Sequence, residues 1–112
     1  MRALRAYEAV GSVPSEKRAD YKGAINDLGA NIMRSGLSAA LASLERKRKG
    51  CGGIILEQLA KAGIPGLEKA TRDDLPKSVR VLDAEAYMLA TRELLKFAAW
   101  LKRAAQATIG ED

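Results

Sequence analysis

Side chains able to do chemistry are few in this chain, because it contains no histidine and a single cysteine, Cys51. Without histidine there is no Ser-His-Asp triad and no histidine base or metal ligand. Cys51 has no internal disulfide partner and no histidine to activate it as a nucleophile. The one close pair of acids, Asp73 and Asp74, is more typical of a turn than of a magnesium site. The sequence therefore predicts no catalytic residue, no metal and no cofactor.

A run of four cations could bind a polyanion: Arg46, Lys47, Arg48 and Lys49. Cations at the C-terminal end of a helix complement its dipole, which accounts for one or two of them without any ligand. Four adjacent cations repel one another, however, and the glycine-rich stretch 50–53 predicts a mobile segment that a polyanion could order. Both interpretations remain open. The stretch lacks the Gly-Lys-Ser/Thr ending of a phosphate loop, so we expect no nucleotide or other small-molecule substrate.

A second basic group lies near the C-terminal end of the sequence. Arg92, Lys96 and Arg103 recur at intervals of four and seven residues, which places them on one face of a helix, with Lys102 beside them. Cations in such a row can follow a phosphate backbone by displacing its condensed counterions. The alternative is a solvated helix face, which is the more common reason for a row of charges.

These groups must be positioned by helices, because the apolar residues recur every three or four positions. The first predicted helix covers residues 1–10, with Leu4, Tyr7 and Val10 on one side. The second covers 16–34, is capped by Ser15, and is ended by Gly36 in a left-handed conformation with a positive φ. The third starts at Leu37 and ends in the basic run 46–49, and the last two cover 54–62 and 84–108, the latter capped by Asp83. The proline, glycine and aspartate residues within 64–82 predict an irregular connector with short helical turns. In the last helix the core stripe is Tyr87, Leu94, Phe97, Ala98, Leu101 and Ala105, while Trp100 falls between core and surface. We expect an all-α fold, a compact bundle of about five helices with a long C-terminal helix.

Length and composition agree with one helical domain over residues 1–112. Hydrophobic residues make up 47% of the chain and charged residues 29%, which is typical of a folded protein. The net charge of +5 favours a polyanion partner such as nucleic acid without proving one. No apolar run approaches the roughly 20 residues that a membrane span needs, so we expect a cytoplasmic protein without a membrane partner.

Two stretches carry a resemblance to a known family. The first runs from Tyr21 to Lys47 and joins two helices through Ile32-Met33-Arg34-Ser35-Gly36-Leu37. The second runs from Tyr87 to Ala105 and contains Ala90-Thr91-Arg92-Glu93-Leu94-Leu95 and Trp100-Leu101-Lys102-Arg103. Together with the chain length and the short N-terminal helix, these stretches resemble the small helical subunit of the type III-B CRISPR effector, the Cmr complex.

The resemblance implies a non-catalytic subunit of an RNA-guided, RNA-targeting ribonucleoprotein used in antiviral defence. Its partners would be the backbone and large subunits, further copies of itself in a filament, and the guide and target RNA. Cleavage of target RNA would fall to the neighbouring backbone subunit. The resemblance makes Gly36 and Leu37 a structural junction, Trp100 and Leu101 packing residues, and Lys102 and Arg103 possible RNA contacts.

Two other functions remain open from the residues alone. One is a DNA-binding helical regulator, because the helices between residues 16 and 62 could contain a helix-turn-helix. The predicted helix that starts at Ile54 offers Glu57, Gln58 and Lys61 for that purpose, which is a poor set for reading bases. The other is a protein-binding helical adaptor.

Overall fold

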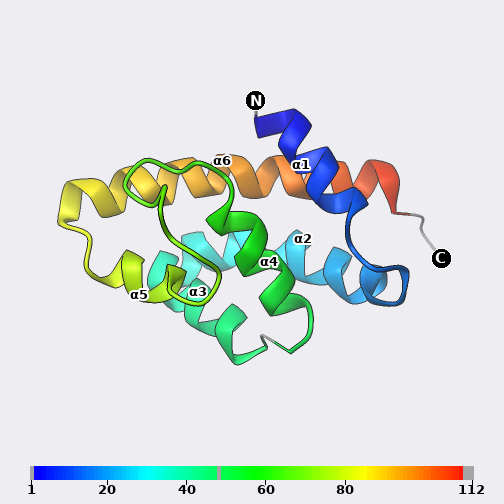
Figure 1. The fold of residues 1–112 in the computed structure, drawn as a ribbon, viewed down its shortest axis with the longest axis horizontal. Coiled ribbons are helices and arrows are strands. Elements are labelled where there is room, and N and C mark those ends of the chain that lie inside the picture. Colours follow the sequence, from blue (N-terminus) through cyan, green and yellow to red (C-terminus); the bar gives the residue numbers. More distant parts are fainter. Residues whose placement is uncertain (1, 48, 110–112) are drawn as a thin grey trace.

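Long, nearly antiparallel helices form the frame of the molecule. The computed structural model describes residues 2–47 and 49–109. Its elements are α1 (Arg2–Gly11), the short 3-10 helix η1 (Ser15–Lys17), α2 (Arg18–Ser35), α3 (Leu37–Arg46), α4 (Cys51–Ala60), α5 (Leu75–Arg80) and α6 (Ala84–Thr108). Figure 1 shows α6 running the length of the molecule, with α1 crossing it and α2 to α5 below it in this view. Of these four, α2 packs along α6, whereas α3 packs against α2, α4 and α5.

Two contacts show that α2 and α6 run in opposite directions. Near the start of α2, the Lys22 ammonium lies 3.5 Å from the Ile109 carbonyl oxygen, just beyond the end of α6. Beyond the other end of α2, the amide of Ser38 in α3 donates to the hydroxyl of Tyr87 in the first turn of α6 over 3.0 Å. The same end holds the sharp junction between α2 and α3. There Gly36 has a φ of +92°, which glycine adopts easily, and its amide donates to the Ile32 carbonyl over 2.8 Å. The prediction of a positive-φ glycine at position 36 is confirmed.

The core is built mainly from leucine, isoleucine and alanine. The α6 stripe is almost as predicted: Leu94, Phe97, Ala98, Leu101 and Ala105 are buried, whereas Tyr87 is half-buried. Asp83 caps α6 as expected, because its carboxylate accepts from the Ala86 amide over 2.8 Å. The all-α fold with a long C-terminal helix is thereby confirmed. Six α-helices are present among the described residues, one more than the predicted five, because the connector contains α5.

Two details near the N-terminus differ from the prediction. In α1 the buried side chains are Ala6 and Val10, whereas Leu4 and Tyr7 are exposed. A helix of three turns has too few apolar positions to define its inward face, and the small Ala6 allows α1 to lie close against α6. Ser15 does not cap α2 either, since it starts η1, and α2 begins at Arg18 without a side-chain cap.

The glycine-rich segment is not the mobile loop that the sequence predicts. Cys51, Gly52 and Gly53 form the first turn of α4, and both glycines are buried. A Cβ atom at Gly52 would lie 2.1 Å from the Leu44 carbonyl oxygen and 2.8 Å from that of Lys47. Glycine is therefore required here because the start of α4 packs directly on the backbone that ends α3.

Candidate nucleic-acid interface

The outward face of α6 carries a row of three exposed cations, Arg92, Lys96 and Arg103. Successive helical residues are about 100° apart, so intervals of four and seven residues bring these side chains within about 40° of one another. The core residues Leu94 and Leu101 occupy the opposite side of the helix. At a rise of about 1.5 Å per residue, the row spans about 16 Å, and the rigid helix holds its spacing. We call these three residues the α6 row.

Lys102 does not belong to this row, contrary to the expectation that it lies beside it. It is exposed, but it lies about 100° around the helix from Arg103 and so faces another direction. Arg103 itself stacks on Trp100, with its guanidinium carbon 5.3 Å from the centre of the indole ring. Trp100 is half-buried against the core, as predicted. The stacking orients Arg103 while its charge stays in contact with solvent.

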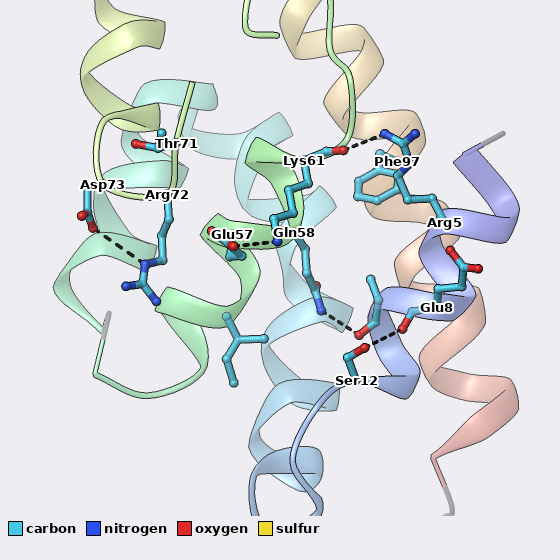
Figure 2. A pocket seen from close by; sticks show the side chains of 12 residues that line it. Arg5, Glu8, Ser12, Glu57, Gln58, Lys61, Thr71, Arg72, Asp73 and Phe97 are labelled. Atoms are coloured by element: carbon cyan, nitrogen blue, oxygen red, sulfur yellow. Dashed lines mark hydrogen bonds and ion pairs between the residues drawn. The ribbon is translucent and has the colours of Figure 1, made fainter. Parts of the chain in front are cut away.

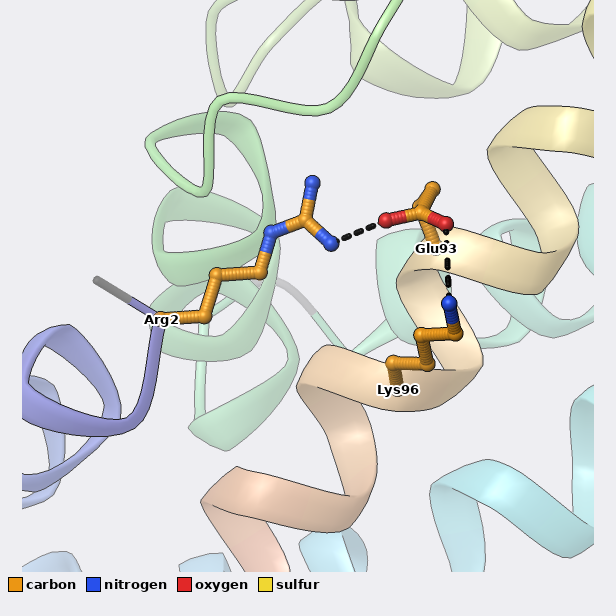
Figure 3. A network of polar contacts seen from close by, with 3 residues as sticks. All are labelled: Arg2, Glu93 and Lys96. Atoms are coloured by element: carbon orange, nitrogen blue, oxygen red, sulfur yellow. Dashed lines mark hydrogen bonds and ion pairs between the residues drawn. The ribbon is translucent and has the colours of Figure 1, made fainter.

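The carboxylate of Glu93 partly neutralises the positive charge of the α6 row at Lys96. Glu93 accepts a bond from Lys96 over 3.3 Å and another from Arg2 of α1, as Figure 3 shows. These two bonds, that of Arg2 foremost, hold the pKa of Glu93 below its ordinary value. Within the described part of the chain, Lys96 is the member of the row with a carboxylate partner. The same glutamate ties α1 to α6.

The contacts of Glu93 predict a pH-dependent stability. A carboxylate whose pKa is lowered by folding stabilises the fold above its unfolded pKa, and that contribution is lost as the pH falls through the folded value. We expect Glu93→Gln to melt below the wild type at pH 7, and the gap to close as the pH falls below about 4.3, the ordinary value for glutamate. Thermal melts of both proteins between pH 7 and pH 3 measure this. A gap that stays constant over the range would contradict it.

The cations of the 46–49 run are not brought together with the α6 row. Arg46, Lys47 and Lys49 are exposed at the turn between α3 and α4, whereas Arg48 lies outside the described residues. Figure 1 places this turn at the lower edge of the molecule and α6 along its upper part. The turn cations also line a groove of ≈ 730 Å³ together with three carboxylates: Asp20, Asp27 and Glu45. The predicted RNA-binding residues therefore form two surfaces, and the described cations at the turn lie beside carboxylates.

Comparison with known proteins decides the family. The sequence model of the family described as "CRISPR-associated protein (Cas_Cmr5)" matches residues 1–108. The chain belongs to the Cmr5 family. The resemblance drawn from the two sequence stretches is thus confirmed, and it extends over nearly the whole chain.

Relatives of known structure or curated name agree with this assignment. The "CRISPR system Cmr subunit Cmr5" of Thermus thermophilus is 32% identical over 110 residues, which cover 97% of this chain and 93% of that protein. Its counterpart in Thermotoga maritima is 30% identical over 115 residues, covering 98% and 83%. A crystal structure of a CRISPR-associated Cmr5 family protein from Thermus thermophilus superposes with a TM-score of 0.85 at 31% identity, over 97% of this chain and 94% of that one.

The surroundings of Asp73, Asp74 and Cys51 in this Cmr5 family member do not favour catalysis or metal binding. Asp74 accepts from the Thr71 amide over 2.6 Å, and Asp73 lies 3.7 Å from Arg72, so both belong to the turn before α5. Cys51 is half-buried. Its burial, and to a smaller extent the negative charge of the nearby Asp20, raises the pKa of its thiol and so disfavours the nucleophilic thiolate. Over residues 2–47 and 49–109, no three cysteine or acidic side chains are grouped so that they could hold a metal ion.

Of the four residues singled out by the resemblance as junction or packing residues, Leu37 and Leu101 lie in the core, whereas Gly36 and Trp100 are half-buried. Leu37 and Leu101 are fully buried, and Gly36 makes the α2–α3 turn beside the Tyr87 hydroxyl.

None of the helices among the described residues combines the length and the apolar character that crossing a membrane requires.

One polar group in the core was not identified from the sequence. Gln58 is 9% exposed, and its amide accepts from the Tyr21 hydroxyl over 2.8 Å and donates to the Ala9 carbonyl over 3.2 Å. The signal available was a glutamine on the inward side of the predicted helix at 54–62. Because Gln58 is used to join α4 to α1 and α2, and Glu57 pairs with Lys61 over 2.9 Å, α4 offers little for reading DNA bases.

Proposed function

We propose that this protein is the small, non-catalytic subunit of a type III-B CRISPR effector, the Cmr complex. Several copies would stand beside the backbone subunits and help hold target RNA along the guide RNA. The observation that carries the proposal is the family match over residues 1–108, because both curated relatives bear the name of a Cmr subunit. Such a complex would act in the cytoplasm, where its RNA targets are.

The α6 row is the surface that we assign to RNA. Its three cations are exposed and lie on one rigid face of the helix. One of them, Lys96, pairs with a carboxylate, that of Glu93. The described cations at the α3–α4 turn line a groove together with Asp20, Asp27 and Glu45, and these carboxylates weaken its attraction for a phosphate backbone. Contacts of this kind bind phosphates and do not read bases, so one subunit could serve any guide sequence.

Catalysis is left to the neighbouring subunits in this proposal. Asp73 and Asp74 belong to the turn before α5, and burial raises the pKa of the Cys51 thiol, which disfavours its nucleophilic form. The small subunit would hold the RNA in position. This would slow the release of the RNA from the complex and leave the RNA chemically unchanged.

The proposal is tested by omission. We expect a guide-loaded Cmr complex assembled without this subunit to release labelled, non-cleavable target RNA at least about 100-fold faster than the complete complex, because the three contacts of the α6 row are lost at about 1 kcal/mol each. A dissociation chase measures this. The purified subunit alone should leave labelled RNA intact in Mg²⁺. Equal release rates with and without the subunit, or failure of the subunit to co-purify with the complex, would contradict the proposal.

A further inference from the structure

An aromatic ring lies beside the α6 row. Trp100 is half-buried, so that part of its side chain packs against the core and the rest reaches the surface. It comes four residues after Lys96 and three before Arg103, and residues at these intervals are neighbours on the surface of a helix. A flat apolar side chain is thus placed between two of the cations that we assign to phosphates.

The α6 row has a gap at the same place. Position 99, three residues after Lys96 and seven after Arg92, lies on the face of the row, but it carries the exposed Ala99. Lys96 and Arg103 are therefore about 10 Å apart along the helix axis, with an uncharged position between them. An RNA strand that contacts both cations can approach the helix here, because the small side chain leaves room for a sugar and a base beside Trp100.

The surface of the Trp100 ring already accepts a flat group. The guanidinium carbon of Arg103 lies 5.3 Å from the centre of the indole. Arg103 is exposed, and an exposed cation–π contact is weaker than the stacking of a base on an aromatic side chain. A base can therefore replace the guanidinium on the ring. Arg103 then turns to a phosphate, with which its N–H groups make charge-assisted hydrogen bonds.

Trp100 is better placed for a base than the other two aromatic side chains of α6. Phe97 is fully buried at the cleft that Arg5 of α1 also lines, as Figure 2 shows, so a ligand does not reach its ring. Tyr87 is held at the α2–α3 junction, where its hydroxyl accepts from the Ser38 amide. The accessible ring of the helix is thus the one beside the cations.

We infer that the accessible part of Trp100 is a stacking site for one unpaired base of the RNA strand that the α6 row holds. Lys96 and Arg103 bind phosphates on either side of that nucleotide, and the base displaces Arg103 from the ring. The inference rests on the proposed function. It adds that the row takes RNA that is unpaired at this point, since only an unstacked base is free to stack on a side chain. Stacking tolerates every base, so the site suits any guide sequence.

The fluorescence of Trp100 tests the inference, because this residue is the only tryptophan of the chain. The isolated protein is titrated with a short single-stranded RNA, with a strand of the same length whose nucleotides are all abasic, and with the RNA paired in a duplex. Tryptophan emission reports on the ring, and anisotropy of a labelled strand gives the affinity.

Three variants accompany the wild type, each checked for an unchanged circular dichroism spectrum. Trp100→Leu removes the ring and keeps an apolar side chain against the core. The matched control, Tyr7→Leu, removes an exposed aromatic ring from α1, outside the row. Arg103→Ala uncovers the Trp100 ring and removes one phosphate contact.

We expect the single-stranded RNA to quench the emission and to bind at least about fivefold tighter than the abasic strand. The duplex and the abasic strand should bind without quenching. The preference for bases should disappear in Trp100→Leu and persist in Tyr7→Leu. Arg103→Ala should bind both strands more weakly and keep the preference.

Equal affinity for the two strands, or emission that the single-stranded RNA leaves unchanged, would overturn the inference and leave the phosphate contacts of the proposed function intact. A preference that survives in Trp100→Leu, or is lost in Arg103→Ala, would overturn the placement of the base on the indole. If Trp100→Leu does not fold, the wild-type emission and affinity ratio decide. A wild type that binds none of the three ligands would contradict the proposed function itself.

Discussion

Gly52→Ala should strongly destabilise the protein. The new Cβ atom would lie 2.1 Å from the Leu44 carbonyl oxygen and 2.8 Å from the Lys47 carbonyl oxygen. Both are backbone atoms, so α4 must move away from the end of α3, and the packing of its first turn is lost. We expect a cost near the upper end of about 1–3 kcal/mol that overpacking usually brings, which lowers the melting temperature by roughly 10 °C.

A matched control is available in the same chain. Gly23 lies in the interior of α2, is exposed, and has no atom within 4 Å of an added Cβ. Gly23→Ala should therefore raise stability by about 0.5–1 kcal/mol, because alanine is the better helix former. Thermal melts of the two variants and the wild type give the comparison. A Gly52→Ala protein that melts at or above the wild-type temperature would show that the α3–α4 turn does not pack as described.

The second large effect concerns RNA. Changing Arg92, Lys96 and Arg103 together to alanine should leave the helix content unchanged, because all three side chains are exposed and alanine favours helices. Arg2 still pairs with Glu93 in this variant, so α1 stays tied to α6. If each lost phosphate contact is worth about 1 kcal/mol at the surface, the three together are worth about 3 kcal/mol, and target RNA should leave the assembled complex about 100-fold faster.

The variant also distinguishes RNA contact from protein contact at this face. We expect it to join the Cmr complex as the wild type does, in a pull-down without target RNA, and to lose retention only when RNA is added. If the variant instead fails to assemble before any target RNA is present, the α6 row packs against protein and our assignment of it to RNA is wrong.

The sequence predicts best what depends on residues close in the chain. Helix α6 and its Asp83 cap follow from an uninterrupted periodic pattern and a local hydrogen bond, and both were predicted with their correct positions. The positive φ of Gly36 likewise follows from a glycine between two apolar patterns. Even the α6 row is a matter of spacing along one helix.

Contacts between distant residues could not be predicted in this way. The pair of Arg2 and Glu93, the buried bonds of Gln58, and the close approach at Gly52 each depend on how helices meet in space. The same limit applies to the basic residues, since spacing alone cannot show that the α3–α4 turn and the α6 row lie on different sides of the molecule. The turn's glycines therefore suggested a mobile loop where the structure has the start of a helix.

The most direct test of the account is the salt dependence of RNA binding by the isolated protein. Two triple variants remove the same charge: one replaces Arg92, Lys96 and Arg103 by alanine, and the other Arg46, Lys47 and Lys49. The slope of log affinity for single-stranded RNA against log salt concentration is measured by fluorescence anisotropy for both and for the wild type. Each lost phosphate contact should reduce the slope by about 0.7, so the α6 variant should flatten it by about 2 and the turn variant should barely change it. Equal slopes for the α6 variant and the wild type, or the larger loss in the turn variant, would contradict the assignment of RNA to the α6 row.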